Sequence, residues 1–405
     1  MNKHILFSLL AAAALTACSG DDATTGIDTQ VAALTFEDSD VEIRLSSGSG
    51  ASLTRSSIES NAYGAFETNG IGVFMLGWQT MNVNPTEVPL TWTPGAIAAT
   101  GTPNFAIKLD NLEANAVMSD DNTYTSIEWA TPATYYYPLG QWYNYRFYGY
   151  APRVEGDNLI STSTQRQAVI TIDGTNDVIW GRDDVTTAED HDAGYTVPQH
   201  AYSSKFFRES AANAESLPNI PFKHLLARLT FSVIAGEDAY GSTEEAVKMR
   251  IRSIKLLDIP TVGTLTIADR TNPANEGNIV FNWNENLADL PLLGANDYDF
   301  SNDDPSALPA VSLEETQVGQ GILIPVPEAG HRFYIRVKMT DENGTEFDEV
   351  EYPFELEMLN PSYQLEANHS YNIRLVVRGP RKIEVRATLK NWEPVENVFD
   401  DREIN

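Results

Sequence analysis

Hydrophobic and polar residues alternate in short segments along most of this chain, as they do in half-buried β-strands. Clear examples are residues 41–45, 225–233, 333–339 and 371–377. Residues 71–76 instead form a continuous apolar run, which is typical of a strand buried on both faces. No segment keeps a helical period, so the many short strands predict an all-β protein. At 405 residues we expect two tandem β-sandwiches.

The predicted domain boundary is the acidic turn at residues 236–241, which separates two strongly patterned strands. We therefore expect an N-terminal β-sandwich domain over residues 41–237 and a C-terminal one over residues 238–405. Residues 18–40 are rich in Ser, Thr, Gly and Asp, and their composition predicts a flexible tether ahead of the first strand.

Residues 1–17 have the features of a secretory signal peptide. A short basic start precedes the apolar run 5–15, which is too short to span a membrane. The sole cysteine, Cys18, directly follows Leu-Thr-Ala, and this arrangement resembles the lipobox of bacterial lipoproteins, in which the thiol is diacylated and the chain is cut before it. The sequence thus predicts lipidation at Cys18; an ordinary signal peptide is the alternative. The acidic pair in residues 19–22 resembles the surface-export signal of Bacteroidetes lipoproteins.

The charge balance restricts the partners of the protein. The chain has 27 Lys and Arg against 57 Asp and Glu, a net charge of −30, which repels phosphate backbones and predicts no nucleic-acid partner. With a single cysteine no disulfide can form within the chain, so burial of apolar area must stabilise the fold.

We find no candidate catalytic residues, cofactor site or metal site in the sequence. The six histidines are scattered, and no nucleophile elbow is present. The acidic stretches 173–177 and 341–348 lack the ligand spacing of a calcium loop and are interpreted as solvated turns. A chance carboxylate pair for glycoside hydrolysis stays open, because sequence does not give separations. We therefore predict a protein that is not an enzyme.

The densest aromatic stretch, residues 135–150, allows two interpretations. Tyr143, Tyr145 and Phe147 fall on one face of a predicted strand, and that face is expected in the core. If the rings were exposed instead, they would form a carbohydrate-stacking platform. The alternative function is therefore a glycan-binding outer-membrane surface lipoprotein.

Several stretches, in the same order over nearly the whole mature chain, together resemble the fimbrillin family, the subunits of type V pili of Bacteroidia. They are the lipobox, the first strand with Thr54-Arg55, residues 71–74, residues 136–139 with 145–150, residues 221–229, and residues 368–373 with the closing segment to Trp392.

This resemblance implies two tandem transthyretin-like β-sandwich domains and export as a lipoprotein to the cell outer membrane. It further implies that a surface arginine-specific protease cuts the chain, which releases the lipid and removes the first strand. A strand donated by another fimbrillin subunit then fills the vacated groove, because unpaired edge groups are a template for an incoming strand. The expected final location is the fimbrium.

The strand at residues 41–45 suits this role. Val41, Ile43 and Leu45 form its expected core face, and a Gly/Ser loop with a candidate cleavage site at Arg55 follows it. We therefore predict that residues 41–55 comprise a removable first strand and its cleavage loop; an uncut arginine in a loop is the alternative. Arg44 would be shielded by strand pairing.

The C-terminal tail departs from the family pattern. After Trp392 its apolar residues, Val395, Val398, Phe399 and Ile404, are out of phase and diluted by acids. Such a tail is a poor donor strand, so the sequence favours a tip, accessory or anchor subunit over a polymerising stalk subunit.

Overall fold

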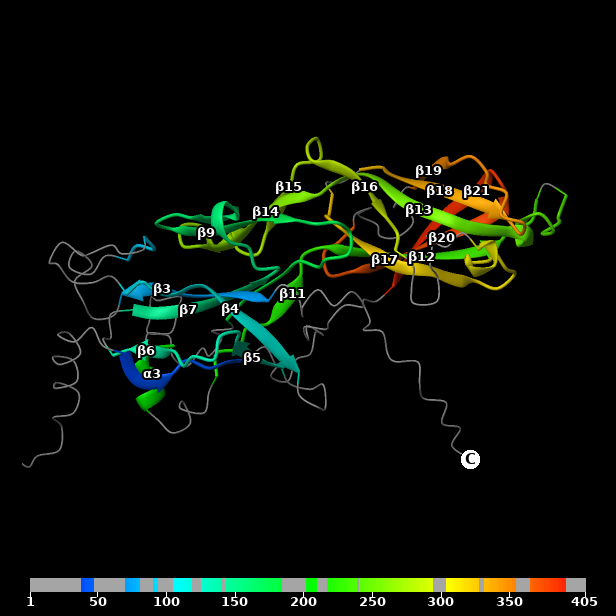
Figure 1. Cartoon of the computed structure of the whole chain (residues 1–405). Coiled ribbons are helices and arrows are strands. Elements are labelled where there is room, and N and C mark those ends of the chain that lie inside the picture. The colour runs from blue at the N-terminus through cyan, green and yellow to red at the C-terminus, as the bar shows by residue number, and fades with distance from the viewer. Residues whose placement is uncertain are drawn as a thin grey trace, which may run out of the picture.

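The computed structural model confirms an all-β protein built from several sheets (Figure 1). The structure describes residues 38–46, 70–80, 90–93, 105–118, 125–139, 143–183, 202–209, 217–238, 240–293, 304–327, 331–354 and 365–390. Helix in these segments is limited to α3 (Ser204–Glu209) and the 3-10 turns Gly156–Asn158, Ala246–Lys248, Pro273–Asn275 and Pro305–Ala307.

Three sheets form the N-terminal part of the molecule. The seven-stranded sheet has the order β11 (Phe222–His224), β10 (Ile179–Arg182), β7 (Tyr143–Ala151), β3 (Ile71–Thr80), β4 (Ile107–Met118), β5 (Thr125–Trp129) and β2 (Leu45–Ser46). A four-stranded sheet has the order β15 (Ile279–Phe281), β14 (Val262–Asp269), β9 (Gln165–Thr171) and β8 (Leu159–Ser161). A two-stranded sheet pairs β1 (Asp38–Glu42) with β6 (Tyr136–Pro138).

Two four-stranded sheets form the other end of the molecule in Figure 1. One has the order β17 (Thr316–Ile324), β12 (Ala227–Ala235), β20 (Ser370–Gly379) and β21 (Lys382–Lys390). The other has the order β16 (Leu287–Pro291), β13 (Met249–Pro260), β18 (Phe333–Asp341) and β19 (Val350–Phe354). Strands β12 and β20, far apart in sequence, pair in parallel over eight residues from Arg228↔Ser370 to Ala235↔Val377.

The buried apolar side chains form two hydrophobic clusters. The first runs from Ile43 to Leu226, and the second begins at Ala227. The chain then returns to the first cluster, because Leu265 and Ile267 of β14 are buried there. The predicted division at residues 237/238 stays a prediction, and the packing adds that the second half of the chain supplies part of the first core.

Strand β7 is central in its sheet and buried on both faces. It lies between β3 and β10, and Tyr143, Tyr145 and Phe147 are at most 2% exposed. Arg146 and Tyr148, on the opposite face, are also buried. The rings of this strand therefore contribute core packing, and none of the three has a face available to stack on a sugar.

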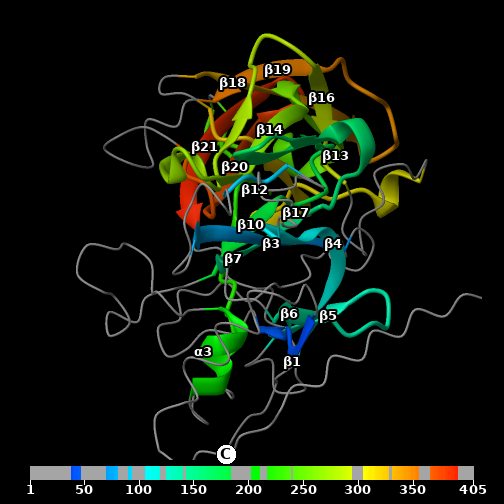
Figure 2. The same cartoon turned by 90° about the vertical axis from the view of Figure 1, so that its left-hand side faces the viewer.

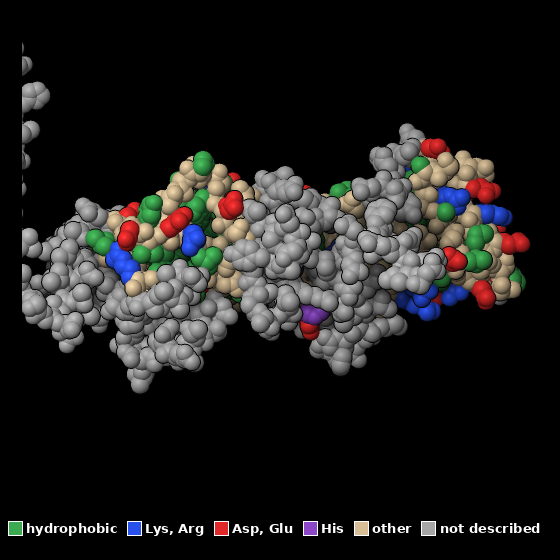
Figure 3. All heavy atoms as spheres, turned by 90° about the horizontal axis from the view of Figure 1, so that it is seen from below, with side chains coloured by type: hydrophobic (Ala, Val, Ile, Leu, Met, Phe, Trp, Pro, Cys, Tyr) green, Lys and Arg blue, Asp and Glu red, His purple; other side chains and the backbone are tan. Residues whose placement is uncertain are grey.

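The surface around the second cluster carries charges of both signs, as the right-hand end of Figure 3 shows. Arg336 contacts Asp289 at 3.1 Å and Glu351 at 2.7 Å, and Arg378 contacts Glu384 at 2.8 Å. Exposed pairs of this kind contribute at most about 1 kcal/mol each, so they matter more for solubility than for stability.

A buried carboxylate lies beside the aromatic strand. Asp183 accepts a hydrogen bond from the Phe147 backbone N–H at 3.0 Å, and a guanidinium nitrogen of Arg146 is 3.7 Å from its other oxygen. Burial outweighs these contacts and raises the pKa of Asp183 to about 7. Burial also raises the pKa of Glu276, which is hydrogen-bonded to Arg182. At a pH between the ordinary pKa of these carboxyl groups and their raised pKa in the folded protein, the native state therefore binds more protons than the unfolded chain.

Because the pKa of Asp183 is raised, we expect the free energy of unfolding to fall as the pH rises from about 4 to about 7. This is the interval between the ordinary pKa of an aspartate and that of Asp183. One extra native proton corresponds to a slope of about 1.4 kcal/mol per pH unit. Asp183→Asn keeps an acceptor for the Phe147 N–H and should flatten this slope, whereas Asp157→Asn, at an exposed turn, should not. Urea unfolding at a series of pH values measures it; equal slopes in wild type and Asp183→Asn would refute the assignment.

Candidate functional site

The candidate site is the N-terminal segment, residues 38–46, together with the groove that holds it. Its first part, β1, pairs antiparallel with β6, and its last two residues, β2, pair antiparallel with β5 through Leu45↔Ile127 and Ser46↔Ser126. Between them the Ile43 N–H donates to the Tyr135 carbonyl at 2.8 Å. In Figure 2 these strands lie together below the β3–β7 layer. The segment thus joins two different sheets over nine residues.

Alternate side chains of the segment enter the first cluster. Ile43 and Leu45 are 0% and 2% exposed, and Val41 is half-buried against the same cluster. Glu42 and Arg44 are exposed. Full burial of two aliphatic side chains of this size contributes roughly 1.5–3 kcal/mol each. The structure therefore places all three predicted core-face residues against the core, with Ile43 and Leu45 as its anchors.

The far side of the segment is held by residues 218–220. The Ser46 N–H donates to the Pro218 carbonyl at 3.0 Å, and the Ile220 N–H donates to the Ser46 carbonyl at 2.8 Å. Ser46 also donates through its hydroxyl to the Asn219 side-chain oxygen at 3.4 Å. The end of the segment consequently lies in a slot between β5 and residues 218–220, with backbone partners on both sides.

Two ion pairs hold the exposed start of the segment. Lys108 contacts the Asp38 carboxylate at 2.5 Å, and Arg208 of α3 hydrogen-bonds Asp40. The hydrogen bond with Arg208 lowers the pKa of Asp40. Because both carboxylates are exposed to solvent, these pairs orient the segment and contribute little to its retention. The apolar anchors and the backbone hydrogen bonds of the slot hold it.

The other two predicted site residues, Cys18 and Arg55, lie outside the described residues. What the sequence missed is the receiving side of the groove: β6, the Tyr135 carbonyl and residues 218–220. The alternation of residues 41–45 indicated which side chains are buried. It carries no signal for which distant backbone groups pair with them, because pairing is set by tertiary contacts.

No group of three or more His, Cys, Asp or Glu side chains suited to a metal ion occurs among the residues that the structure describes. In the same residues, helices long and apolar enough to cross a membrane are also lacking.

Comparison with known proteins identifies a family whose profile matches most of the chain. A family profile described as fimbrillin-like matches residues 54–392. A search of curated proteins finds no match. Solved structures that resemble this fold include a proposed cell adhesion protein from Bacteroides uniformis, with 12% identity, 87% of this chain and 100% of that chain covered, and a TM-score of 0.45.

Two further structures come from Porphyromonas gingivalis. The fimbrial anchor protein Mfa2 has 11% identity, with 87% of this chain and 96% of that chain covered and a TM-score of 0.33. The tip fimbrial protein Mfa3, with a C-terminal truncation, has 12% identity, with 87% and 100% covered and a TM-score of 0.35.

The groove predicts an unequal response to substitutions at neighbouring positions of the segment. Ile43→Ala should lower the free energy of unfolding by about 2–5 kcal/mol, because it leaves a cavity in the first cluster. Arg44→Ala, one residue away and exposed, should change it by about 0.5 kcal/mol or less. Chemical denaturation of both variants measures this. Equal effects at the two positions would show that the segment is not anchored through Ile43.

Proposed function

The chain belongs to the fimbrillin-like family, and we propose that it is a structural, non-enzymatic subunit of a cell-surface pilus, of the tip, accessory or anchor type. We further propose that it is assembled by β-strand complementation after proteolysis removes its N-terminal segment, and that it contributes to adhesion. The surface location and the association with other fimbrial subunits follow from what this family is.

The observation that carries the proposal is how the N-terminal segment is attached: buried side chains anchor it in the core, and backbone hydrogen bonds hold it locally. Two side chains are buried, and the backbone is hydrogen-bonded to Tyr135 at Ile43 and to Pro218 and Ile220 at Ser46. Its departure would leave these groups and the β5 edge unpaired beside an apolar slot. Unpaired backbone groups next to apolar pockets bind an extended strand by adding it to the sheet. A strand from another subunit, with apolar residues at alternate positions, fits this slot.

Lipidation at Cys18 and cleavage after Arg55 connect this groove to the membrane. Before cleavage, the lipid would hold the protein on the outer membrane. A cut after Arg55 by a surface arginine-specific protease would remove residues 18–55, and with them both the lipid and the N-terminal segment. The same cut would thus release the protein from the membrane and open the groove.

The tail after Trp392 supports a tip, accessory or anchor role, because its apolar residues do not alternate as a donor strand requires. Such a subunit would accept a strand without donating one. The acidic net charge of −30 fits a protein exposed outside the cell and without nucleic-acid partners.

Cleavage should lower the melting temperature of the protein, and a supplied strand should restore it. We expect limited digestion with an arginine-specific protease to cut first after Arg55. Once gel filtration has removed the released fragment, the melting temperature should fall, since the anchors at Ile43 and Leu45 are lost. A synthetic peptide of residues 38–46 should raise it again in a concentration-dependent way.

Two controls make this experiment specific. Arg55→Gln should resist the cut and keep the wild-type melting temperature under digestion. A peptide of residues 38–46 carrying Ile43→Asp and Leu45→Asp should fail to restore stability, because its charges cannot enter the apolar slot. If the cut protein melts at the wild-type temperature, the segment is not a removable strand and the assembly mechanism is wrong.

The lipid anchor gives a separate prediction. Cys18→Ala should abolish incorporation of radioactive palmitate and move the precursor out of the membrane fraction, because the sole thiol that can be acylated is gone. Ser19→Ala is the matched control and should label normally. Undiminished labelling of Cys18→Ala would sink the lipoprotein assignment without touching the groove.

A further inference from the structure

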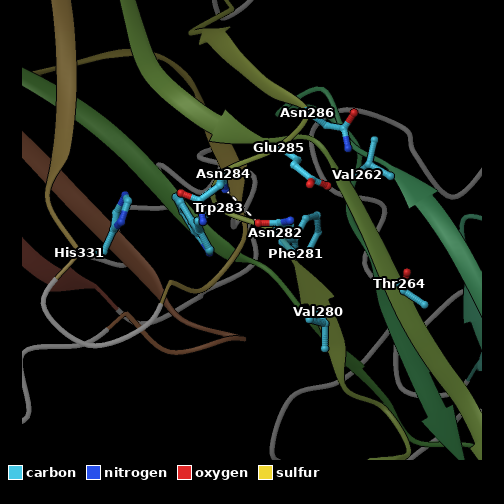
Figure 4. Close-up of a pocket in the computed structure, with 10 residues that line it drawn as sticks. All are labelled: Val262, Thr264, Val280, Phe281, Asn282, Trp283, Asn284, Glu285, Asn286 and His331. Atoms are coloured by element: carbon cyan, nitrogen blue, oxygen red, sulfur yellow. Dashed lines mark hydrogen bonds between the residues drawn. The ribbon is translucent and has the colours of Figure 1, made fainter.

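A pocket of about 610 Å³ lies beside the turn that joins β15 to β16, two strands that belong to different sheets (Figure 4). Phe281 at the end of β15 packs against the first cluster, and Trp283, two residues later, packs against the second. Val262 and Thr264 of β14 line one side, and His331, just before β18, lines the other. Its volume falls within the roughly 300–1,000 Å³ typical of small-molecule sites.

The aromatic wall of the pocket is held in place from behind. The rings of Trp283 and His331 have centroids 4.2 Å apart and are tilted by 50°, and both rings also contact the buried Phe333. Trp283 is half-buried, so one part of the indole is fixed by the core while the rest lines the pocket. A rigid, half-exposed indole offers a large apolar surface at a low entropic cost.

The rim of the pocket carries amides. Asn282, Asn284 and Asn286 are exposed and belong to the turn that lines it. The turn is fixed, because the Asn286 carbonyl accepts from the Thr261 N–H at 2.9 Å and from its hydroxyl at 2.8 Å. The Asn284 N–H donates to the Asn282 side-chain oxygen at 3.1 Å, the dashed line in Figure 4. Each amide side chain presents both donors and acceptors, which suits vicinal hydroxyl groups.

The Phe281 ring, which lines the pocket, lies close to the backbone of β14. A Cβ added at Gly263 would lie 2.7 Å from ring atoms of Phe281, so the ring rests directly on the β14 backbone. The absence of a side chain at Gly263 therefore allows the Phe281 ring to lie against the β14 backbone. The site is built by the same strand pairing that joins β14 to β15.

The charge of the lining selects against anions. Of the residues that line the pocket, all from the described part of the chain, Glu285 is the one carboxylate, and Lys and Arg are lacking. Partial burial lowers the pKa of His331, which leaves its ring uncharged at neutral pH. A ligand bearing phosphate, sulfate or carboxylate would find no cation here. A neutral ligand with one apolar face and several hydroxyls would pack that face against Trp283 and hydrogen-bond its hydroxyls to the asparagine amides.

We propose that this pocket binds a neutral saccharide, with the C–H face of a pyranose ring against Trp283 and its hydroxyls bonded to the amides of Asn282, Asn284 and Asn286. The site is distinct from the buried rings of β7. Its use in adhesion rests on the proposed pilus function, whereas saccharide binding by the protein itself does not. The two proposals can therefore fail separately.

The test measures binding to the full-length mature protein. Methyl glycosides of mannose, galactose, glucose and N-acetylglucosamine, and their disaccharides, serve as probes at millimolar concentration in saturation-transfer NMR, followed by calorimetric titration. We expect at least one neutral probe to bind, with proton contacts from one face of the ring. Trp283→Ala and Asn284→Ala should each weaken that binding roughly tenfold or more, about 1.4 kcal/mol.

Matched variants separate loss of binding from loss of fold. Trp283→Phe keeps an aromatic ring against Phe333 and should retain wild-type melting while binding more weakly. Asn343→Ala, in another exposed turn, should bind as the wild type does. The proposal is overturned if no neutral probe binds, if binding survives both Trp283→Ala and Asn284→Ala, or if sialic acid or glucuronic acid binds more tightly than every neutral probe.

Discussion

The first hydrophobic cluster is fully buried only when segments from two other parts of the chain cover it, and the rest of the molecule depends on this constraint. Its buried residues include Ile43 and Leu45 from the N-terminal segment and Leu265 and Ile267 from β14. An apolar surface left uncovered by either would be exposed to water at a cost of about 25 cal/mol per Å². The stability of the N-terminal part therefore depends on segments that reach it from two directions along the chain.

These two covering segments differ in how they are attached. Strand β14 is followed by β15 and β16 and preceded by β13, and both β13 and β16 belong to a sheet of the second cluster. It cannot leave without unravelling that sheet. The N-terminal segment precedes the rest of the domain and is held by the β1–β6 and β2–β5 pairings, the Ile43–Tyr135 backbone hydrogen bond and the slot at residues 218–220. The proposed strand-acceptor role needs both kinds of segment: an N-terminal segment that could leave the first cluster, and a strand such as β14 that stays in it.

The sequence predicted the local part of this arrangement better than the nonlocal part. Period-two alternation identified several strands, among them β12, β18 and β20, and the inward side chains of residues 41–45, because burial of one face imposes that period. It placed in the core the face of β7 that carries Tyr143, Tyr145 and Phe147, and the structure also buries the opposite face, with Arg146 and Tyr148. The return of β14 to the first core and the residues 218–220 slot follow from tertiary packing, to which a single sequence gives no pattern. The roles of Cys18 and Arg55 are predicted from sequence motifs alone, and both residues lie outside the described residues.

The first part of the N-terminal segment and the proposed saccharide pocket lie on opposite sides of the seven-stranded sheet. Figure 1 places β6 on one side of the β3–β7 layer and β14 and β15 on the other, and Figure 2 places β1 and β6 opposite β14. A strand that entered the groove would therefore not cover Trp283 or its amides. The chain passes between the clusters near residue 226 and again between β13 and β14, so the two parts are tied by more than one connection. Such ties restrict hinge motion, and a subunit fixed at its groove would present the pocket in a constant direction. On the two proposals made above, assembly and recognition would use different surfaces of the same protein.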